Sequence, residues 1–372
     1  MHKPTKLLSL LTCVVMLFTF TACSKNNDNS SVAVTKKTES SVSDTTKETK
    51  ETAKKTEQKQ STRKTEKAIN ILTGNDNISA KAKGKRPVAV MVNNIDASMP
   101  QYGIYKADML FECPVEGGIT RLMALYSDYT SVPKVCSVRS CRYYFAYFAS
   151  SFDAIYLHWG IDKIIAENKL AQLKIDHIDG NVNTTLFKRD QERLSSYSLE
   201  HSGYCDGSLI PSEVKNAGIR TDLKNGYNTT AFSFLDKTQA ISKQKANSVV
   251  INFSDYYSSA FNYDSKAKNY KKLRNGEKHI DASNNKQLVY SNVIVLESNE
   301  IKVVNKDNGL LSLDWKGGTG YCFSGGAVKK IKWKKDSELG KLKLTDENGN
   351  TLKINKGKTY IGVTKKGTLS YS

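Results

Sequence analysis

The chain has 372 residues, of which 56 are basic and 37 acidic, so its formal net charge is +19. Only one stretch near the N-terminus is apolar enough to approach a membrane span, which excludes a protein with several transmembrane helices. Nucleic acid is not an expected partner because the first segment predicts export.

That first segment has the pattern of a secretory signal. Lys3 and Lys6 give a basic start, and residues 7–22 carry no charge. The string Phe20-Thr21-Ala22-Cys23 is similar to a lipobox, in which the cysteine thiol receives a diacylglyceryl group. We therefore expect a signal peptide over residues 1–22 and a lipid on Cys23 that anchors the chain at the outer face of the cell membrane. An uncleaved anchor helix and ordinary secretion are the alternatives.

Residues 23–67 form the next segment, rich in Lys, Ser, Thr and Glu and poor in large apolar side chains. Such a composition cannot bury enough surface to offset chain entropy, which predicts a disordered tether. A flexible chain of this length would have an r.m.s. span on the order of 40 Å. The tether would hold the following domains away from the membrane, and we expect no further role for it than spacing.

Residues 68–235 mix strand and helix patterns and predict an α/β domain with a mixed sheet. Strands are expected at residues 87–92, 107–113, 119–126 and 154–158, with helical patterns at 142–152, 163–173 and 211–216. Gly117 and Gly118 separate the second and third strands and predict a hairpin there.

Residues 245–367 show strand patterns without a long helix, which predicts a mainly antiparallel β domain. Strands are expected at residues 249–253, 288–296, 301–304, 310–315, 327–333, 341–344, 351–354 and 360–363. The segment from Lys245 to Lys366 carries 23 basic and 12 acidic residues. This basic surface would suit anionic lipid headgroups or anionic wall polymers, although it could simply confer solubility.

Besides Cys13 and Cys23, the cysteines are Cys113, Cys136, Cys141, Cys205 and Cys322, an odd number. Cys136 and Cys141 could form a local disulfide in an oxidising exterior, while most of the five are expected to be small buried residues. Neither CxxC spacing nor a paired Cys/His set occurs, so we expect no metal site. The sequence indicates no particular cofactor.

The densest group of polar residues lies at the expected strand ends and turns of the first domain. Its members are Glu112, Glu116, Arg121, Arg139, Arg142 and His158. Ligands of α/β domains often bind just beyond strand ends, and guanidinium groups suit phosphate or carboxylate. Arg139 and Arg142 would share one face if a helix began at Ser140, with its first amides directed to the same side.

Each of these features also has a purely structural interpretation. The arginines and glutamates could form ordinary ion pairs that hold turns, and His158 could be a hydrogen-bonded core residue. His201, beside Glu200, is expected in a loop. His279 and Asp281 lie in a polar turn that could bind a ligand or simply close a loop.

Several strings resemble the YerB-type lipoprotein family. They are residues 86–94, 107–108, 114–121, 137–145 and 153–160 in the first part, and 270–281, 292–295 and 318–321 in the second. The resemblance covers nearly everything after the tether and implies a two-part domain of unknown function without an established reaction. The chain differs from the family where Cys141 stands in place of the usual alanine.

Three functions remain open from the sequence. The first is a lipoprotein that binds an anionic envelope ligand, wall polymer or peptidoglycan. The second is an envelope enzyme that acts on a phosphate-containing glycan or lipid-linked intermediate. It rests on Ser137-Val138-Arg139-Ser140-x-Arg142, which is loosely similar to the strand-strand-Ser-x-x-Arg arrangement of LytR-CpsA-Psr phosphotransferases. The third, a solute-binding lipoprotein, is disfavoured because the chain lacks two similar-sized α/β lobes.

Overall fold

The structure is a computed structural model that describes residues 67–229 and 231–372. The predicted signal peptide, the expected lipidation site Cys23 and the tether up to residue 66 lie outside the described residues. Within the described part of the chain, no helix has the length and apolarity that a membrane span requires.

The N-terminal part combines strands with short helices. Its elements are β1 (Lys67–Ile69), β2 (Asp76–Ser79), β3 (Val88–Asn93), β4 (Met109–Pro114), the 3-10 turn η4 (Glu116–Gly118), β5 (Thr120–Tyr126), β6 (Val135–Cys136), α1 (Tyr143–Ser150), β7 (Ile155–His158), α2 (Ala166–Gln172), β8 (His177–Asp179), β9 (Phe187–Arg189), α3 (Gln191–Leu194), β10 (Gly203–Cys205) and α4 (Ile210–Asn216).

Strands dominate the remainder of the chain. They are β11 (Ser233–Phe234), β12 (Ser248–Ser254), β13 (Tyr257–Asp264), β14 (Asn269–Arg274), β15 (Glu277–Lys278), β16 (Ile280–Asp281), β17 (Lys286–Gln287), β18 (Val289–Tyr290), β19 (Asn292–Ser298), β20 (Ile301–Asn305), β21 (Leu310–Leu313), β22 (Gly317–Ser324), β23 (Ala327–Lys334), β24 (Lys343–Asp346), β25 (Lys353–Ile354), β26 (Thr359–Lys365) and β27 (Leu369–Tyr371). The predicted combination of a mixed α/β part and a mainly antiparallel β part is confirmed.

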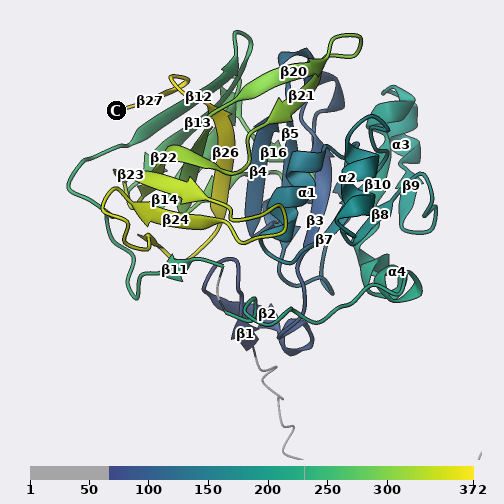
Figure 1. The fold of residues 1–372 in the computed structure, drawn as a ribbon, viewed down its shortest axis with the longest axis horizontal. Coiled ribbons are helices and arrows are strands. Elements are labelled where there is room, and N and C mark those ends of the chain that lie inside the picture. The colour runs from purple at the N-terminus through teal and green to yellow at the C-terminus, as the bar shows by residue number, and fades with distance from the viewer. Residues whose placement is uncertain (1–66, 230) are drawn as a thin grey trace, which may run out of the picture. The chain divides into compact units, whose positions relative to one another are not determined.

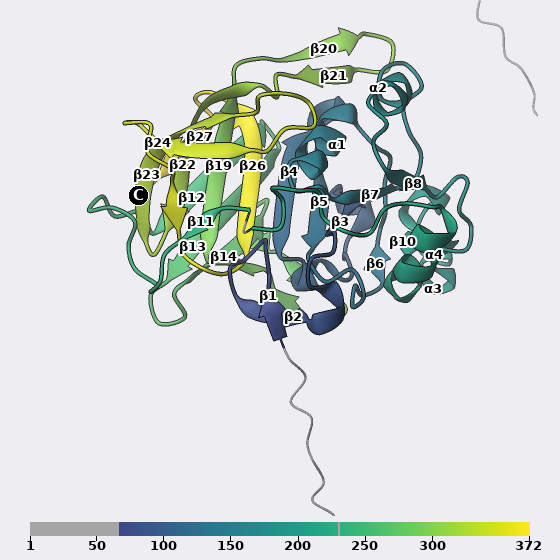
Figure 2. The same cartoon turned by 60° about the horizontal axis from the view of Figure 1, so that its bottom comes forward.

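One ten-stranded sheet runs through both parts in the order β24-β23-β22-β19-β26-β4-β5-β3-β7-β8. Figure 2 shows these strands side by side across the molecule. The two parts meet where β26, close to the C-terminus, pairs in parallel with β4. On the other side of β4, the β4–β5 hairpin forms as predicted, and Gly117 and Gly118 turn its connection with φ values of 71° and 69°.

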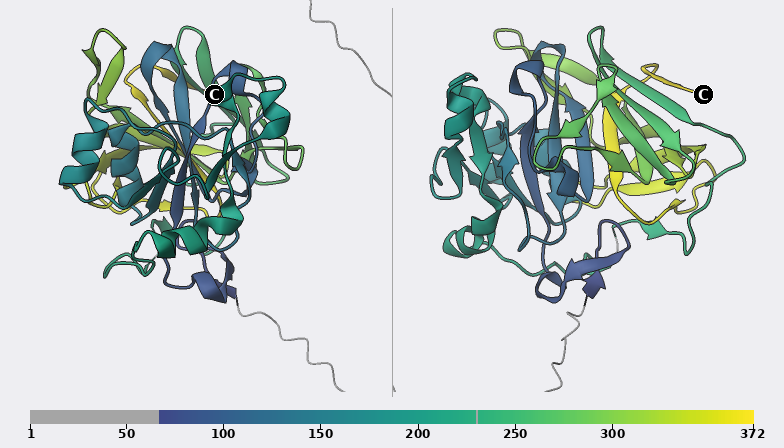
Figure 3. Two further views of the ribbon diagram at one scale, coloured as in Figure 1. Left: turned by 90° about the vertical axis from the view of Figure 1, so that its right-hand side faces the viewer. Right: turned by 180° about the vertical axis from the view of Figure 1, so that it is seen from behind.

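The central strands are buried on both faces, which explains their nearly continuous apolar runs. In β3, Ala89 and Met91 belong to one hydrophobic cluster, and the alternating Val88, Val90 and Val92 belong to the other. Helix α1 lies over the first face (Figure 1), and its aromatic side chains belong to the hydrophobic cluster on that face. The sheet built on β12, β13 and β14 covers the other, and Figure 3 (right) shows these green strands from behind.

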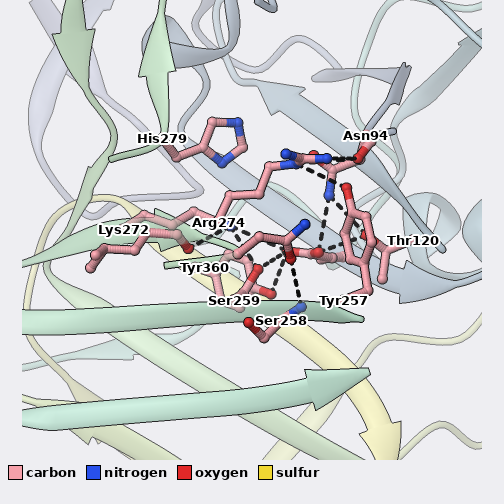
Figure 4. Close-up of polar contacts among 12 residues, drawn as sticks. Asn94, Thr120, Tyr257, Ser258, Ser259, Lys272, Arg274, His279 and Tyr360 are labelled. Carbon is pink, nitrogen blue, oxygen red and sulfur yellow. Dashed lines mark hydrogen bonds and ion pairs between the residues drawn. The ribbon is translucent and has the colours of Figure 1, made fainter. Parts of the chain in front are cut away.

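A buried carboxylate joins the two parts of the chain. Glu112 in β4 is fully buried, and its Oε1 accepts hydrogen bonds from Thr120 Oγ1 at 2.7 Å and Asn94 Nδ2 at 3.1 Å. Its Oε2 accepts from Ser259 Oγ and Tyr360 OH, both at 2.7 Å. Figure 4 shows these four partners, two from the N-terminal part and two from the C-terminal part.

The cation in this cluster is Lys272 of β14, which is also fully buried. Its Nζ lies 3.5 Å from Glu112 Oε2 and donates to Ser259 Oγ at 2.7 Å. Burial lowers the pKa of Lys272, while the Glu112 carboxylate opposes that shift. Two buried charges therefore depend on each other across the junction of the two parts.

Replacing Lys272 with Met should lower the free energy of unfolding by about 3–5 kcal/mol, because Glu112 would stay buried without its cation. Lys271→Met is the matched control, since Lys271 is the exposed neighbour on β14 and pairs with Asp264 at the surface. Its loss should cost less than about 1 kcal/mol. Urea unfolding measures both. Equal effects of the two substitutions would contradict the proposed role of the pair.

All five cysteines in the described part of the chain are free and buried, so a Cys136–Cys141 disulfide is not formed. The backbones of the two residues have different neighbours. Cys136 lies opposite Tyr204 of β10 in a strand pair, and Cys141 forms a β-bridge with Ile161. Burial raises the pKa of Cys136 to about 11 and that of Cys141 to about 12.

These thiols should therefore be inert in the folded protein, because thiolate is the reactive form. We expect Ellman's reagent to label none of the five within minutes at pH 8, and all of them once urea unfolds the chain. Fast labelling of Cys136 or Cys141 in native protein would show that its environment is more open than the structure indicates.

Candidate functional site

The candidate site lies at one edge of the ten-stranded sheet. Strands β3, β4 and β7 run in the same direction, and their carboxyl ends meet at this edge. It is the position where α/β sheets most often bind ligands. Of the six residues singled out from the sequence, the structure gathers Glu116, Arg121, Arg139 and Arg142 here and gives Glu112 and His158 other surroundings.

Arg142 and Glu116 form a bidentate ion pair. Arg142 Nε lies 2.5 Å from Glu116 Oε1, and the terminal nitrogen Nη2 donates to Oε2 at 2.8 Å. Burial alone would raise the pKa of Glu116, but the hydrogen bonds and charge of Arg142 lower it below its ordinary value. The pair is therefore charged at neutral pH and holds the η4 turn against the start of α1.

The helical pattern expected over residues 142–152 corresponds to α1, but the helix does not start at Ser140, so the condition for a shared face of Arg139 and Arg142 is not met. Helix α1 begins at Tyr143, and Arg142 precedes it in an extended conformation with φ −128° and ψ 136°. The reason is that the Cys141 N–H donates to Gly160 O at 2.9 Å, which keeps this segment paired with the chain after β7. Arg139 and Arg142 therefore lie on non-helical backbone before α1 and do not share a helix face.

Arg121 lies near the start of β5, close to the turn, and is 6% exposed. Its Nη1 donates to Ser140 O at 2.7 Å, whereas its Nε has no partner in the described part of the chain. Burial and then the charge of Arg142 lower its pKa to about 10. It still carries its charge at neutral pH, and no carboxylate of the described residues forms an ion pair with it.

Arg139 lies beside Arg121 and contacts a different carboxylate. Its Nη1 is 2.9 Å from Glu200 Oε2, and its buried Nε lacks a partner among the described residues. Glu200 is 54% exposed and also approaches His201 Nε2 at 3.6 Å. The other nitrogen of His201 lies 3.1 Å from Asn93 Nδ2, at the end of β3. His201 is thus buried beside the site, where the sequence predicted a loop residue.

Arg189 of β9 is a fourth arginine that the sequence analysis missed. Its guanidinium stacks on Trp159 at 4.0 Å from the ring centre, and Nη1 donates to Leu199 O at 2.6 Å. Burial and the charge of Arg139 lower its pKa. A three-residue strand gives no sequence signal for such a role, because Trp159 lies 30 positions earlier.

Together, four arginines form what we call the arginine row: Arg142, Arg121, Arg139 and Arg189. Glu116 pairs with Arg142 and Glu200 with Arg139, so Arg121 and Arg189 form no ion pair with a carboxylate of the described residues. The charge of Glu116 also acts on Arg121, where it opposes the effect of burial on the pKa, and that of Asp162 acts in the same sense on the pKa of Arg142. The buried hydroxyl of Ser137 next to Val138 also has no hydrogen-bond partner among them. Guanidinium groups with free donors at a strand edge can bind phosphate or carboxylate.

His158 lies in the sheet and not in the arginine row. It is fully buried, with Nδ1 2.8 Å from Gly160 O and Nε2 2.9 Å from His177 Nδ1. This pattern requires Nδ1 of each ring to donate. His158 therefore has the structural role of holding the turn that pairs with Cys141.

His279 and Asp281, the other polar pair singled out from the sequence, form hydrogen bonds between the two parts of the chain. His279 Nε2 lies 2.5 Å from Gln101 Oε1, and Asp281 accepts from the Gly103 and Tyr105 amides. No group of three or more potential metal ligands occurs in the described residues.

Burial is the main cause that lowers the pKa of His158 to about 4, while the charge of Asp179 opposes it. The unfolded chain binds this proton at about pH 6.5. Stability from His158 should thus be complete above that pH and be lost as the pH falls toward 4, by about 2–3 kcal/mol. Urea unfolding between pH 7 and 4.5 should show a steeper decline for wild type than for His158→Gln. Identical pH profiles would contradict a neutral, buried His158.

Comparison with known proteins places the chain in a family. Residues 72–220 match the N-terminal domain, and residues 249–361 the C-terminal domain, of the family described as "Protein of unknown function (DUF3048)". The chain is 28% identical over 315 residues to a Bacillus subtilis (strain 168) protein named "Putative lipoprotein YerB", which covers 82% of this chain and 89% of that one.

A crystal structure of the YerB protein from Bacillus subtilis is similar as well, with a TM-score of 0.70 and 27% identity over 81% of this chain and 98% of that one. The resemblance found in the sequence is therefore confirmed. Both family domains are present in their order and span most of the described residues. The chain belongs to the DUF3048 family of two-part, YerB-like proteins.

Proposed function

We propose that this protein is a lipoprotein anchored at the outer face of the cell membrane. It binds an anionic ligand of the cell envelope at the arginine row. The observation that carries the proposal is the charge left at the strand edge. Arg121 and Arg189 form no ion pair with a carboxylate of the described residues. A phosphate or carboxylate group would supply the missing negative charge and accept hydrogen bonds from guanidinium groups.

The second part of the proposal concerns the location of the protein. Lipid on Cys23 would keep the described domains near the membrane, and the relative's name, "Putative lipoprotein YerB", agrees with such an anchor. Anionic envelope polymers would then lie within reach of the described domains. The basic surface after Lys245 would add a weaker attraction for the same polymers or for peptidoglycan.

An enzyme that transfers phosphate-containing glycans is less well supported. Phosphoryl transfer needs a base or a cation to activate the acceptor. Glu116 and Glu200 at the arginine row are already engaged in ion pairs. Asp162, whose charge acts on Arg142, accepts from the Ile165 and Ala166 amides through Oδ1. The arrangement of the described residues therefore favours binding over catalysis.

Binding of poly(glycerol phosphate) to the full chain in detergent tests the proposal. Arg139→Gln should weaken binding about tenfold, because it removes a charged donor from a partly buried site. Lys169→Gln, at an exposed position of α2, removes the same charge elsewhere and should leave binding unchanged. The affinity should also fall as salt is added. No binding by wild type, or equal binding by Arg139→Gln, would contradict the proposal.

A further inference from the structure

The arginine row is elongated, and backbone pairing defines its order. Arg121 lies opposite Asn93 in the β5–β3 pair. The Asn93 N–H donates to Ser137 O at 2.8 Å, and the Val138 N–H donates to Gly203 O at 2.8 Å. Gly203 in turn lies opposite Arg189 in the β10–β9 pair. Four lateral steps between neighbouring backbones thus separate Arg121 from Arg189.

Each lateral step between paired strands is about 4.8 Å, so the two arginines are on the order of 15–20 Å apart along the backbone. Arg139 follows Val138 and lies between them. Mutual charge effects give the same order: the pKa of Arg121 is lowered by Arg142 and Arg139, whereas Arg139 is the charged neighbour that lowers the pKa of Arg189. The sequence along the edge is therefore Arg142, Arg121, Arg139 and Arg189.

Arginines without an ion pair lie at two separate positions in this row. Glu116 neutralises Arg142 at one end, and the half-exposed Glu200 pairs with Arg139 in the middle. The guanidinium groups without a carboxylate among the described residues, Arg121 and Arg189, lie on either side of Arg139. Both are held in place by protein contacts, Arg121 by Ser140 O and Arg189 by Trp159 and Leu199 O.

We infer that the ligand is an elongated anion with oxyanion groups, phosphate or carboxylate, at two or more positions. One group would bind at Arg121 and Arg139, and a second would bind at Arg189. A single small anion bound at one of these positions would leave the arginine at the other position without an ion pair. This inference rests on the proposed function and adds the shape and valency of the ligand.

Two series of probes test it with the full chain in detergent: glycerol phosphate oligomers and galacturonate oligomers, each with one and four repeats. Four repeats should bind at least about tenfold more tightly than one in the series that matches the natural chemistry. The better series distinguishes a phosphodiester chain from an acidic polysaccharide. Titration calorimetry at low salt gives the four affinities.

Arg189→Gln should abolish the affinity advantage of the four-repeat probe over the one-repeat probe. Lys188→Gln is the matched control, because Lys188 is the exposed neighbour on β9 and the same charge is lost. The melting temperature of Arg189→Gln verifies folding; if that variant fails to fold, the length dependence of wild type decides alone.

Equal affinities for one and four repeats in both series would overturn the inference and leave the proposed function intact. The same holds if folded Arg189→Gln keeps the full advantage of length. If none of the four probes binds, the proposed function itself fails. These outcomes separate the shape of the ligand from its existence.

Discussion

The Glu112 carboxylate is the interaction on which the rest of the structure depends. It is buried where β4 pairs with β26, and it needs every one of its four hydrogen bonds and the charge of Lys272 to be stable there. Such a pair contributes little net stability but penalises any arrangement that separates its members. The two family domains are consequently specified as one unit, in which the sheet of one continues into the other.

This junction also supports the candidate site. Asn94, which donates to Glu112, follows Asn93, whose side chain contacts His201 beside Glu200 and Arg139. Arg274 of the C-terminal part donates to Asn94 O at 2.9 Å. The end of β3 is therefore held from both sides, and the arginine row extends from a rigid strand end and not from a free loop. Rigid placement of charged donors reduces the entropy lost when a ligand binds.

The parts of this architecture that could be predicted are those that depend on neighbouring residues. Runs of apolar residues and the glycines of one turn predicted β3, the β4–β5 hairpin and β7. Charge at strand ends singled out Arg121, Arg139 and Arg142 together with Glu116, and the structure brings these four residues close together. The same reasoning assigned Glu112 to the ligand, because nothing nearby in the chain shows that Lys272 would be buried against it.

The missing information concerns contacts between distant residues. Met109 and Thr359 pair across the junction although 250 positions separate them, and short apolar strands carry no mark of their partner. Arg189 joins the row because Trp159 offers a ring face, which is a tertiary contact. The possible Cys136–Cys141 disulfide does not form for the same reason, since proximity in sequence does not place two side chains on facing strands.

The most direct measurement is a crystal structure of the protein soaked in millimolar tungstate, whose anomalous signal locates an oxyanion without ambiguity. We expect tungstate at the arginine row, within hydrogen-bond distance of the guanidinium groups of Arg121 and Arg139. A fully occupied anion elsewhere with the arginine row empty would contradict it, and would show that these arginines serve only to hold turns.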